Sequence, residues 1–273
     1  MAGARCRAGT RNRPDPQIYL PAVSEPHPLS LSENPLPRRR RSGCLITLEG
    51  GEGSGKSTQV ATIRRMLEAV GIEVITTREP GGTPAAEALR ETLLAGTFRK
   101  LGPEAEAVLF AAARIIHLDD LIVPALAAGT WVVCDRFIDS TRVYQGLVDG
   151  LDPHLLDLLE TVALGALRPD LTLVLDVDAA IALQRARQRR GAASPDRFEA
   201  GDIARYQRIQ AGFREIAARA GERCVLVDGA RPADVVGHEI ENLIARRLFS
   251  RLRREKWRKH QDAMAETPVH GAS

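Results

Sequence analysis

The stretch LITLEGGEGSGKST, residues 45–58, decides the fold of this chain. A β-forming apolar run leads straight into glycines, a lysine and hydroxyl side chains. The spacing matches G-x-x-x-x-G-K-[ST], the phosphate-binding P-loop, with the fixed glycines at Gly50 and Gly55 and the lysine at Lys56. Glycines let successive backbone N–H groups turn toward phosphate oxygens, and the helix that begins there adds the positive end of its dipole. The stretch therefore predicts a nucleoside triphosphate site and leaves the phosphate acceptor open.

The whole loop is predicted to bind ATP, through Gly50, Gly51, Glu52, Gly53, Ser54, Gly55, Lys56, Ser57 and Thr58. Lys56 is expected to reach the β and γ phosphates, and Ser57 to be a ligand of Mg²⁺. The flanking sequence fits a P-loop, which follows a strand and opens a helix. Residues 44–49 are apolar and β-forming, and residues 56–71 place apolar side chains at helical spacing before a final glycine. A glycine-rich surface turn is therefore the weaker interpretation.

Strand-like and helix-like runs alternate from residue 44 to residue 249. Strands are predicted at 44–49, 73–77, 130–135, 171–177 and 224–228. Helices are predicted at 56–70, 84–95, 103–128, 139–149, 153–167, 178–190, 202–220 and 232–249. Near-continuous apolar strands indicate a sheet buried on both faces, which is parallel and covered by helices. We therefore predict one three-layer α/β domain whose ligands bind at the carboxyl ends of its five parallel strands.

Bulk composition narrows the class of protein. The 273 residues suffice for one α/β domain, and a net charge of +3 is too balanced to indicate nucleic-acid binding by itself. No apolar run reaches the ~18 residues of a membrane span. The cysteines are scattered and the histidines form no cluster, so we expect no zinc site. Scattered cysteines also fit a reducing, cytoplasmic setting. We expect neither a nucleic-acid nor a membrane partner.

The two ends differ from the middle in composition. Residues 1–42 are rich in proline and serine, end in an arginine cluster and lack periodicity, which predicts a disordered extension. An acidic partner for the arginines and a start codon assigned too early are alternatives. Residues 43–249 form the predicted domain. Residues 250–273 are predicted to be a basic, solvated helix end with a frayed tail, and a nucleic-acid or membrane contact is the less favoured alternative.

The segment VVCDRFIDSTRVYQG, residues 132–146, is the second strong signal. Asp135 ends a hydrophobic strand, where P-loop enzymes place an acid that orients Mg²⁺, and Arg136 follows on the ligand edge. An ordinary Asp–Arg surface pair is a poor alternative, because charges beside such a strand must be solvated or partnered. The helical turns that follow offer polar groups to a second substrate: Ser140, Thr141, Tyr144 and Gln145.

Two further segments supply candidates for the acceptor site. REPGG, residues 78–82, follows the second strand and contains Glu79, and Arg90 lies about two helical turns further on. An ordinary turn between the strand and the next helix would explain this segment equally well. Phe110 and Arg114 are spaced i, i+4 on one helix face, which makes a stacking surface beside a hydrogen-bonding fork plausible, although such a phenylalanine is most often core.

An arginine-rich run lies at residues 184–199 and contains Arg185, Arg187, Arg189, Arg190 and Arg197. A charge run is usually a solvated helix face. Here it breaks into GAASPD, a flexible segment, so residues 185–199 are predicted to be a lid that closes over the transferring phosphate. Arg189 and Arg190 are the candidates for catalytic lid arginines.

Taken together, these motifs resemble those of the bacterial thymidylate kinases. The family signature D-R-[aromatic]-x-x-S-[ST]-x-x-[YF]-Q is matched by DRFIDSTRVYQ at 135–145, and REPGG and the DRFE at 196–199 are further family marks. The resemblance covers residues 44–249. It implies a P-loop kinase fold with a lid, phosphorylation of dTMP to dTDP by ATP with Mg²⁺, and a homodimer.

The resemblance also implies how the base is read. Phe110 would stack on thymine, and Arg114 and Gln145 would hydrogen-bond its polar edge. Thr141 would lie near the base, and Tyr144 would lie under the deoxyribose, where it disfavours a 2′-hydroxyl.

For the sugar and monophosphate, the resemblance implies Glu79, Arg90 and Arg136, with Glu52 facing them. Family members supply a mobile arginine from the P-loop or from the lid. In this chain Gly53 occupies the P-loop position where such an arginine would lie, so the chain resembles the family members whose arginine comes from the lid. Its lid is longer than a compact family lid, which leaves open which arginine reaches the phosphates.

The expected mechanism needs no strong general base, because the second pKa of a phosphate monoester is about 6 and the acceptor oxygen is largely ionised near neutral pH. Lys56, Arg136, Asp135 and the lid arginines would act by positioning and charge neutralisation. Two alternatives remain from the sequence. One is another nucleoside monophosphate kinase, for dUMP, UMP or CMP, and the other is a P-loop ATPase module that regulates a partner.

Overall fold

The computed structural model describes residues 43–96, 102–190 and 202–266. The predicted disordered extension, residues 1–42, lies outside the described residues. So do residues 191–199 of the predicted lid and the end of the tail, residues 267–273.

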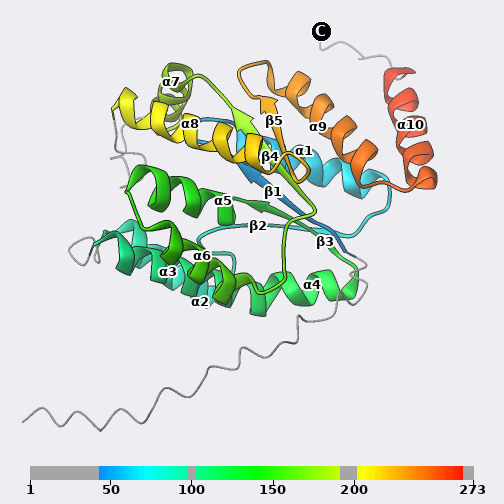
Figure 1. The fold of residues 1–273 in the computed structure, drawn as a ribbon. Coiled ribbons are helices and arrows are strands. Elements are labelled where there is room, and N and C mark those ends of the chain that lie inside the picture. The colour runs from blue at the N-terminus through cyan, green and yellow to red at the C-terminus, as the bar shows by residue number, and fades with distance from the viewer. Residues whose placement is uncertain (1–42, 97–101, 191–201, 267–273) are drawn as a thin grey trace, which may run out of the picture. The chain divides into compact units, whose positions relative to one another are not determined.

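A five-stranded parallel sheet forms the centre of the fold (Figure 1). Its strands are β1 (Leu45–Glu49), β2 (Val74–Arg78), β3 (Trp131–Asp135), β4 (Leu171–Asp176) and β5 (Cys224–Asp228). The spatial order is β2-β3-β1-β4-β5, and every neighbouring pair is parallel. All five residues of β1 are buried, as the continuous apolar run predicts for a central strand. The predicted α/β fold with five parallel strands is confirmed.

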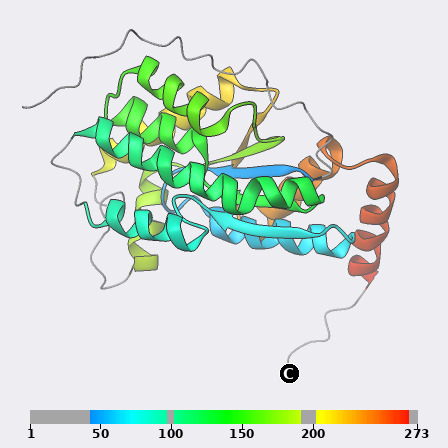
Figure 2. The same cartoon turned by 90° about the horizontal axis from the view of Figure 1, so that it is seen from below.

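Helices cover both faces of the sheet (Figures 1 and 2). Along β1, Ile46 and Leu48 belong to one apolar cluster and Leu45 to another, as the alternation of side chains along a strand requires. The first cluster is completed by α1 (Lys56–Ala69) and α9 (Ala233–Arg247). The opposite face is covered by α4 (Val123–Ala128), α5 (Ile138–Thr141) and α8 (Ile203–Arg219).

The remaining elements flank this framework. They are α2 (Pro84–Leu94), α3 (Pro103–His117), the π-helical segments η2 (Leu118–Ile122) and η3 (Arg142–Val148), α6 (Pro153–Leu164) and α7 (Ala179–Arg190). The predicted helix 103–128 is therefore divided into α3, η2 and α4. The division precedes Pro124, which has no N–H to donate and crowds the preceding turn, so a wider turn ahead of it relieves the conflict.

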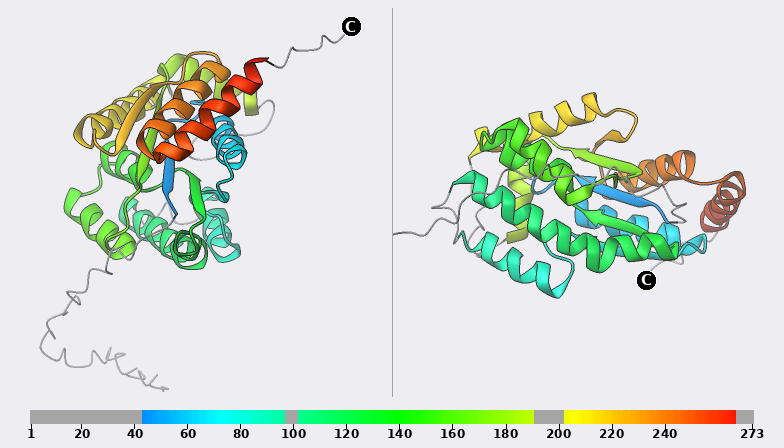
Figure 3. Two further views of the ribbon diagram at one scale, coloured as in Figure 1. Left: turned by 90° about the vertical axis from the view of Figure 1, so that its right-hand side faces the viewer. Right: turned by 60° about the horizontal axis from the view of Figure 1, so that its bottom comes forward.

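A separate helix, α10 (Arg251–Glu266), occupies the part of the chain for which a frayed tail is predicted (Figure 3). α10 lies beside α9 and buries Trp257, which is only 6% exposed and joins the cluster that contains Trp131 and Phe249. The Arg253 guanidinium lies 5.9 Å from the centre of the Trp131 ring. Among the described side chains of α10, Trp257 is buried and the others are exposed or partly exposed, so the indole ties an otherwise solvated helix to the core. Among the described helices, none is both long and apolar enough to span a membrane.

Candidate active site

The P-loop connects β1 to α1 and lies against α7. A Cβ atom on Gly53 would lie 2.2 Å from the backbone oxygen of Ala182, and the φ angle of Gly53 is +75°, so only glycine fits there. Lys56 is the first residue of α1, and its side chain is buried. Its Nζ donates hydrogen bonds to the carbonyl oxygens of Gly50 (3.0 Å) and Gly51 (2.9 Å). The ammonium group is thus held directly over the loop.

Ser57 and Asp135 meet where α1 begins and β3 ends. Ser57 Oγ donates to Asp135 Oδ2 at 3.0 Å. The other carboxylate oxygen, Oδ1, is buried and has no hydrogen-bond partner within the described part of the chain. A hydroxyl oxygen and a carboxylate with a vacant lone pair form a donor set that suits a hard cation such as Mg²⁺.

Arg136 connects the P-loop to the segment that follows β3. Its backbone φ is +70°, a value rarely found outside glycine. Its Nη1 donates to Gly50 O (3.2 Å), Ser140 Oγ (3.3 Å) and Tyr144 Oη (3.3 Å), and its Nη2 pairs with Glu52. Burial alone would raise the pKa of Glu52, but Arg136 and then Lys56 hold it well below its usual range. Glu52 is therefore ionised at neutral pH and fixes the Arg136 guanidinium.

A pocket of about 580 Å³, partly open to solvent, lies beside Arg136 between α2, α3 and α5. It is lined by Glu52, Glu79, Pro80, Arg90, Leu94, Phe110, Arg114, Arg136, Phe137, Ser140, Thr141, Tyr144 and Gln145. All nine predicted acceptor-binding residues line this pocket, so we name it the acceptor pocket. Sequence reasoning missed Pro80, Leu94 and Phe137. Leu94 lies one turn after Arg90, and that i, i+4 spacing is the signal by which it could have been found.

At the buried end of the acceptor pocket, the Arg114 side chain is 4% exposed. Its Nε donates to Glu79 Oε2 at 2.7 Å, and its Nη2 donates to Thr141 Oγ1 at 3.0 Å and to Phe137 O at 3.3 Å. Gln145 is also buried, and its Nε2 has no hydrogen-bond partner among the described residues. A buried N–H group without an acceptor is costly, so this end of the pocket favours a ligand with a carbonyl group.

Arg90 lines the pocket from α2 and is partly buried, and its Nη1 donates to Pro80 O at 2.8 Å. The lid candidates come from the end of α7. Arg189 is exposed, and its Nη2 lies 3.1 Å from Glu52 Oε2. It therefore reaches the same carboxylate that holds Arg136. Nothing is described of the Arg190 side chain.

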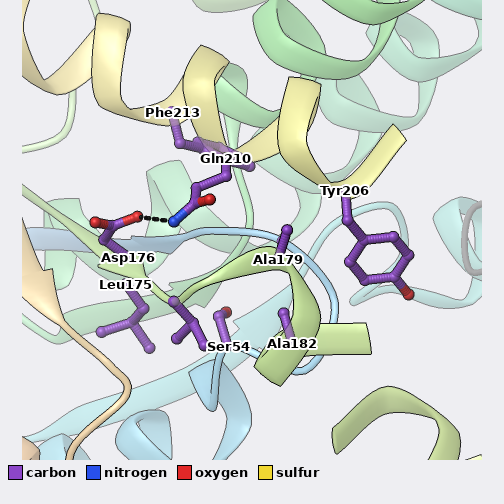
Figure 4. A pocket seen from close by; sticks show the side chains of 10 residues that line it. Ser54, Leu175, Asp176, Ala179, Ala182, Tyr206, Gln210 and Phe213 are labelled. Atoms are coloured by element: carbon purple, nitrogen blue, oxygen red, sulfur yellow. Dashed lines mark hydrogen bonds between the residues drawn. The ribbon is translucent and has the colours of Figure 1, made fainter. Parts of the chain in front are cut away.

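A second, narrow cavity lies behind the P-loop between β4, α7 and α8 (Figure 4). Gln210 Nε2 donates to Asp176 Oδ1 at 3.0 Å at one end of it. Ser54 Oγ is buried there with no hydrogen-bond partner in the described ranges. This cavity marks the packing of the P-loop on α7, since most of its lining is apolar.

Comparisons with known proteins agree on one family. A family model described as thymidylate kinase matches residues 48–240. The thymidylate kinase of Bradyrhizobium sp. strain ORS 278 is 46% identical over 220 residues, which are 81% of this chain and 97% of that protein. The thymidylate kinase of Nitrobacter winogradskyi is 50% identical over 198 residues, which are 72% of this chain and 86% of that protein. The chain belongs to the thymidylate kinase family.

A solved structure supports the same assignment. The crystal structure of thymidylate kinase from Ehrlichia chaffeensis matches with a TM-score of 0.61 at 31% sequence identity, and the match covers 74% of this chain and 98% of that one. As a thymidylate kinase, the chain is a phosphotransferase that uses ATP to convert dTMP to dTDP. The resemblance drawn from the motifs is thereby confirmed. Neither alternative, the dUMP, UMP or CMP kinase or the regulatory ATPase module, gains support.

Proposed function

We propose that this thymidylate kinase binds dTMP in the acceptor pocket and ATP along the P-loop, and that phosphoryl transfer takes place between Arg136 and Lys56. The observation that carries the proposal is the arrangement of donors along the pocket. Neutral and charged donors for a base lie at its buried end, and Arg136 lies at the end nearest the P-loop.

For the base, Phe110 would supply a stacking surface, and Arg114 and Gln145 would supply hydrogen bonds. The Gln145 amide N–H would meet a pyrimidine carbonyl. Cytosine carries an amino group where thymine carries a carbonyl, so it would leave buried partners unpaired at a cost of about 1–3 kcal/mol per group. The thymine methyl group adds only about 0.8 kcal/mol of burial, so dUMP should be rejected less strongly than dCMP. Tyr144 would lie under the deoxyribose.

For the phosphates, Arg136 and Arg90 would hold the monophosphate of dTMP, and Lys56 would leave the carbonyls of Gly50 and Gly51 to neutralise charge on ATP. Burial, with Arg136 next in importance, lowers the pKa of Lys56 from its ordinary value. Phosphate oxygens would counter that effect and favour the charged form. The acceptor phosphate is largely ionised near pH 7, so positioning and charge neutralisation suffice without a general base.

Ser57 and Asp135 would hold Mg²⁺, because the buried Asp135 Oδ1 has no other partner within the residues described. When bound, the cation supplies further neutralisation of phosphate charge. Glu52 would orient Arg136 throughout and would attract Arg189 from the lid, because both arginines contact its carboxylate.

We extend the proposal to a homodimer, which the exposed apolar side chains of α6 support. Leu158 and Val162 lie one turn apart on α6 and are 59% and 62% exposed, and Val108, on the neighbouring α3, is also exposed. Exposed apolar side chains grouped on one surface are typical of protein–protein contacts.

An acceptor panel tests the proposed base recognition. ADP formation would be measured with ATP and dTMP, dUMP or dCMP, for the wild-type protein and for Gln145→Ala. We expect kcat/KM to fall in the order dTMP, dUMP, dCMP, and we expect the preference for dTMP over dCMP to shrink about tenfold in the variant. If wild type accepts dCMP as well as dTMP, or if the variant leaves the ratios unchanged, the assigned recognition is wrong.

A further inference from the structure

His117 is a buried side chain that has no part in the phosphoryl transfer proposed for this site. It is the last residue of α3, one turn after Arg114, and it is 0% exposed. Its Nε2 lies 2.7 Å from Thr77 Oγ1, and its Nδ1 lies 3.3 Å from Glu79 Oε1. The ring thus joins α3 to the end of β2 and to the loop that carries Glu79.

The loop after β2 closes tightly over this ring. A Cβ atom on Gly82 would lie 2.5 Å from His117 Nε2 and 2.4 Å from Thr77 Oγ1, and the φ angle of Gly82 is +93°. Only glycine allows so close an approach. The imidazole is therefore the surface on which the REPGG loop is seated.

Glu79 divides its two carboxylate oxygens between two partners. Oε1 faces His117 Nδ1, and Oε2 accepts the hydrogen bond from Arg114 Nε at 2.7 Å. A carboxylate held at both oxygens cannot rotate about its last bond. Its orientation therefore aims the Arg114 guanidinium, whose Nη2 then meets Thr141 Oγ1.

We infer that His117 is a positioning residue for base recognition, which fixes the Glu79 carboxylate and through it the Arg114 guanidinium. This inference rests on the proposed role of Arg114 at the base. The proton assignment follows from the partners. An ionised carboxylate only accepts hydrogen bonds, so Nδ1 carries the proton that faces Glu79. In the neutral ring Nε2 is then the acceptor, and the Thr77 hydroxyl donates to it.

Two amide substitutions test the contributions of the two ring nitrogens one at a time. In His117→Asn the amide nitrogen lies about where Nδ1 lies and can donate to Glu79, whereas in His117→Gln it lies about where Nε2 lies and faces Thr77. Asparagine also leaves the larger hole, so a role in packing alone predicts that the asparagine variant is the worse of the two.

Steady-state kinetics with dTMP, dCMP and ATP give the readout. We expect His117→Gln to raise KM for dTMP about tenfold and to lower the dTMP-to-dCMP preference, with kcat and KM for ATP within about threefold of wild type. His117→Asn should stay within about threefold in all of these. Equal KM values for dTMP in the two variants, or a normal KM in His117→Gln, would overturn the inference.

The protonation of the ring can also be measured in the wild-type protein, which covers the case of a variant that does not fold. Nitrogen-15 NMR of histidine-labelled protein reports which ring nitrogen carries the proton. The Thr77→Val variant identifies the signals of His117. A proton on Nδ1 is expected, and an unprotonated Nδ1 overturns the inference. Arg114→Ala separates the two proposals. If it leaves base preference unchanged, the proposed base recognition fails. If it abolishes the preference while His117→Gln does not alter it, only the role of His117 fails.

Discussion

At the residue scale, Lys56 is a buried cation with a proposed role at the phosphates of ATP. Its Nζ rests on the Gly50 and Gly51 carbonyls, an arrangement that ATP phosphates can replace. In Lys56→Met the apolar stem is kept and the charge is lost. We expect kcat to fall by about a hundredfold or more, because one electrostatic contact at the transferring phosphate is removed. Turnover would be measured by ADP formation and folding by thermal melting. Near-normal turnover in a folded variant would contradict the role of Lys56.

Glu49 supplies a second residue-scale prediction. It ends β1, fully buried, and accepts hydrogen bonds from Phe137 N (2.8 Å) and Ser140 Oγ (2.6 Å). Burial, followed by the nearby Asp139 carboxylate, raises the pKa of Glu49 from 4.5 to about 8. Between these pH values the folded protein keeps a proton that the unfolded chain has lost. This contribution to stability is fully present below pH 4.5 and is lost as pH rises through 8.

Glu49→Gln resembles the protonated acid and does not titrate. Its Tm should therefore rise relative to that of wild type by roughly 2–5 °C per pH unit within this window, and no further above it. Melting curves recorded at intervals of about half a pH unit, from about pH 5 to about pH 9, would measure this difference in Tm. Glu73→Gln controls for the loss of one exposed carboxyl group. A Tm difference that does not vary with pH would show that Glu49 is ionised throughout.

Residue positions could be predicted where the chain spacing itself fixes the local geometry. Residues 50–57 and 135–137 lie on short loops whose geometry is local, and REPGG could be placed at the same sheet edge once the strands were known. His117 could not be assigned in this way. Its partner Thr77 is 40 residues away, and the hydrogen bond depends on how α3 packs on β2. The sequence places Lys56 at the start of a helix, but its burial depends on how the loop packs.

At the element scale, the buried Trp257 side chain is the described apolar contact that ties α10 to the core of the domain. The sequence places Leu252 and Trp257 in an otherwise basic run, which is too little periodicity to distinguish packing from a solvated end. Trp257 enters the cluster near Trp131, the first residue of β3, at the amino end of the strands. This position lies opposite the carboxyl ends where the P-loop and the acceptor pocket lie.

Trp257→Ala should therefore destabilise the fold without changing catalysis. A buried tryptophan that is truncated costs up to about 3–5 kcal/mol, and a terminal helix that can detach should lose less, about 2 kcal/mol. We expect Tm to fall by roughly 4–8 °C with kcat and KM within about twofold of wild type. The exposed Lys256→Ala on the same helix is the matched control. An unchanged Tm would mean that α10 contributes nothing to the core, and a large loss of kcat would link it to the site.

At the scale of the whole molecule, α3 serves two surfaces at once. One side carries Phe110 and Arg114 into the acceptor pocket, and the helix also packs on α6, whose outer face presents Leu158 and Val162. An isologous contact around a two-fold axis would bury the same apolar side chains from both copies. Composition alone could not predict this surface, because apolar residues on a helix indicate core and interface equally well.

The proposed dimer is testable through that face. Light scattering after size-exclusion chromatography should give twice the chain mass for wild type. Leu158→Glu combined with Val162→Glu should give a monomer, because two like charges per copy would meet in a desolvated contact and cost several kcal/mol. Val235→Glu, at a similarly exposed apolar position on α9, should remain dimeric and controls for added charge. A monomeric wild type would remove the dimer from the proposal. A dimer that survives the double substitution would place the contact on another surface, since glutamates on the true contact could not be buried without a partner.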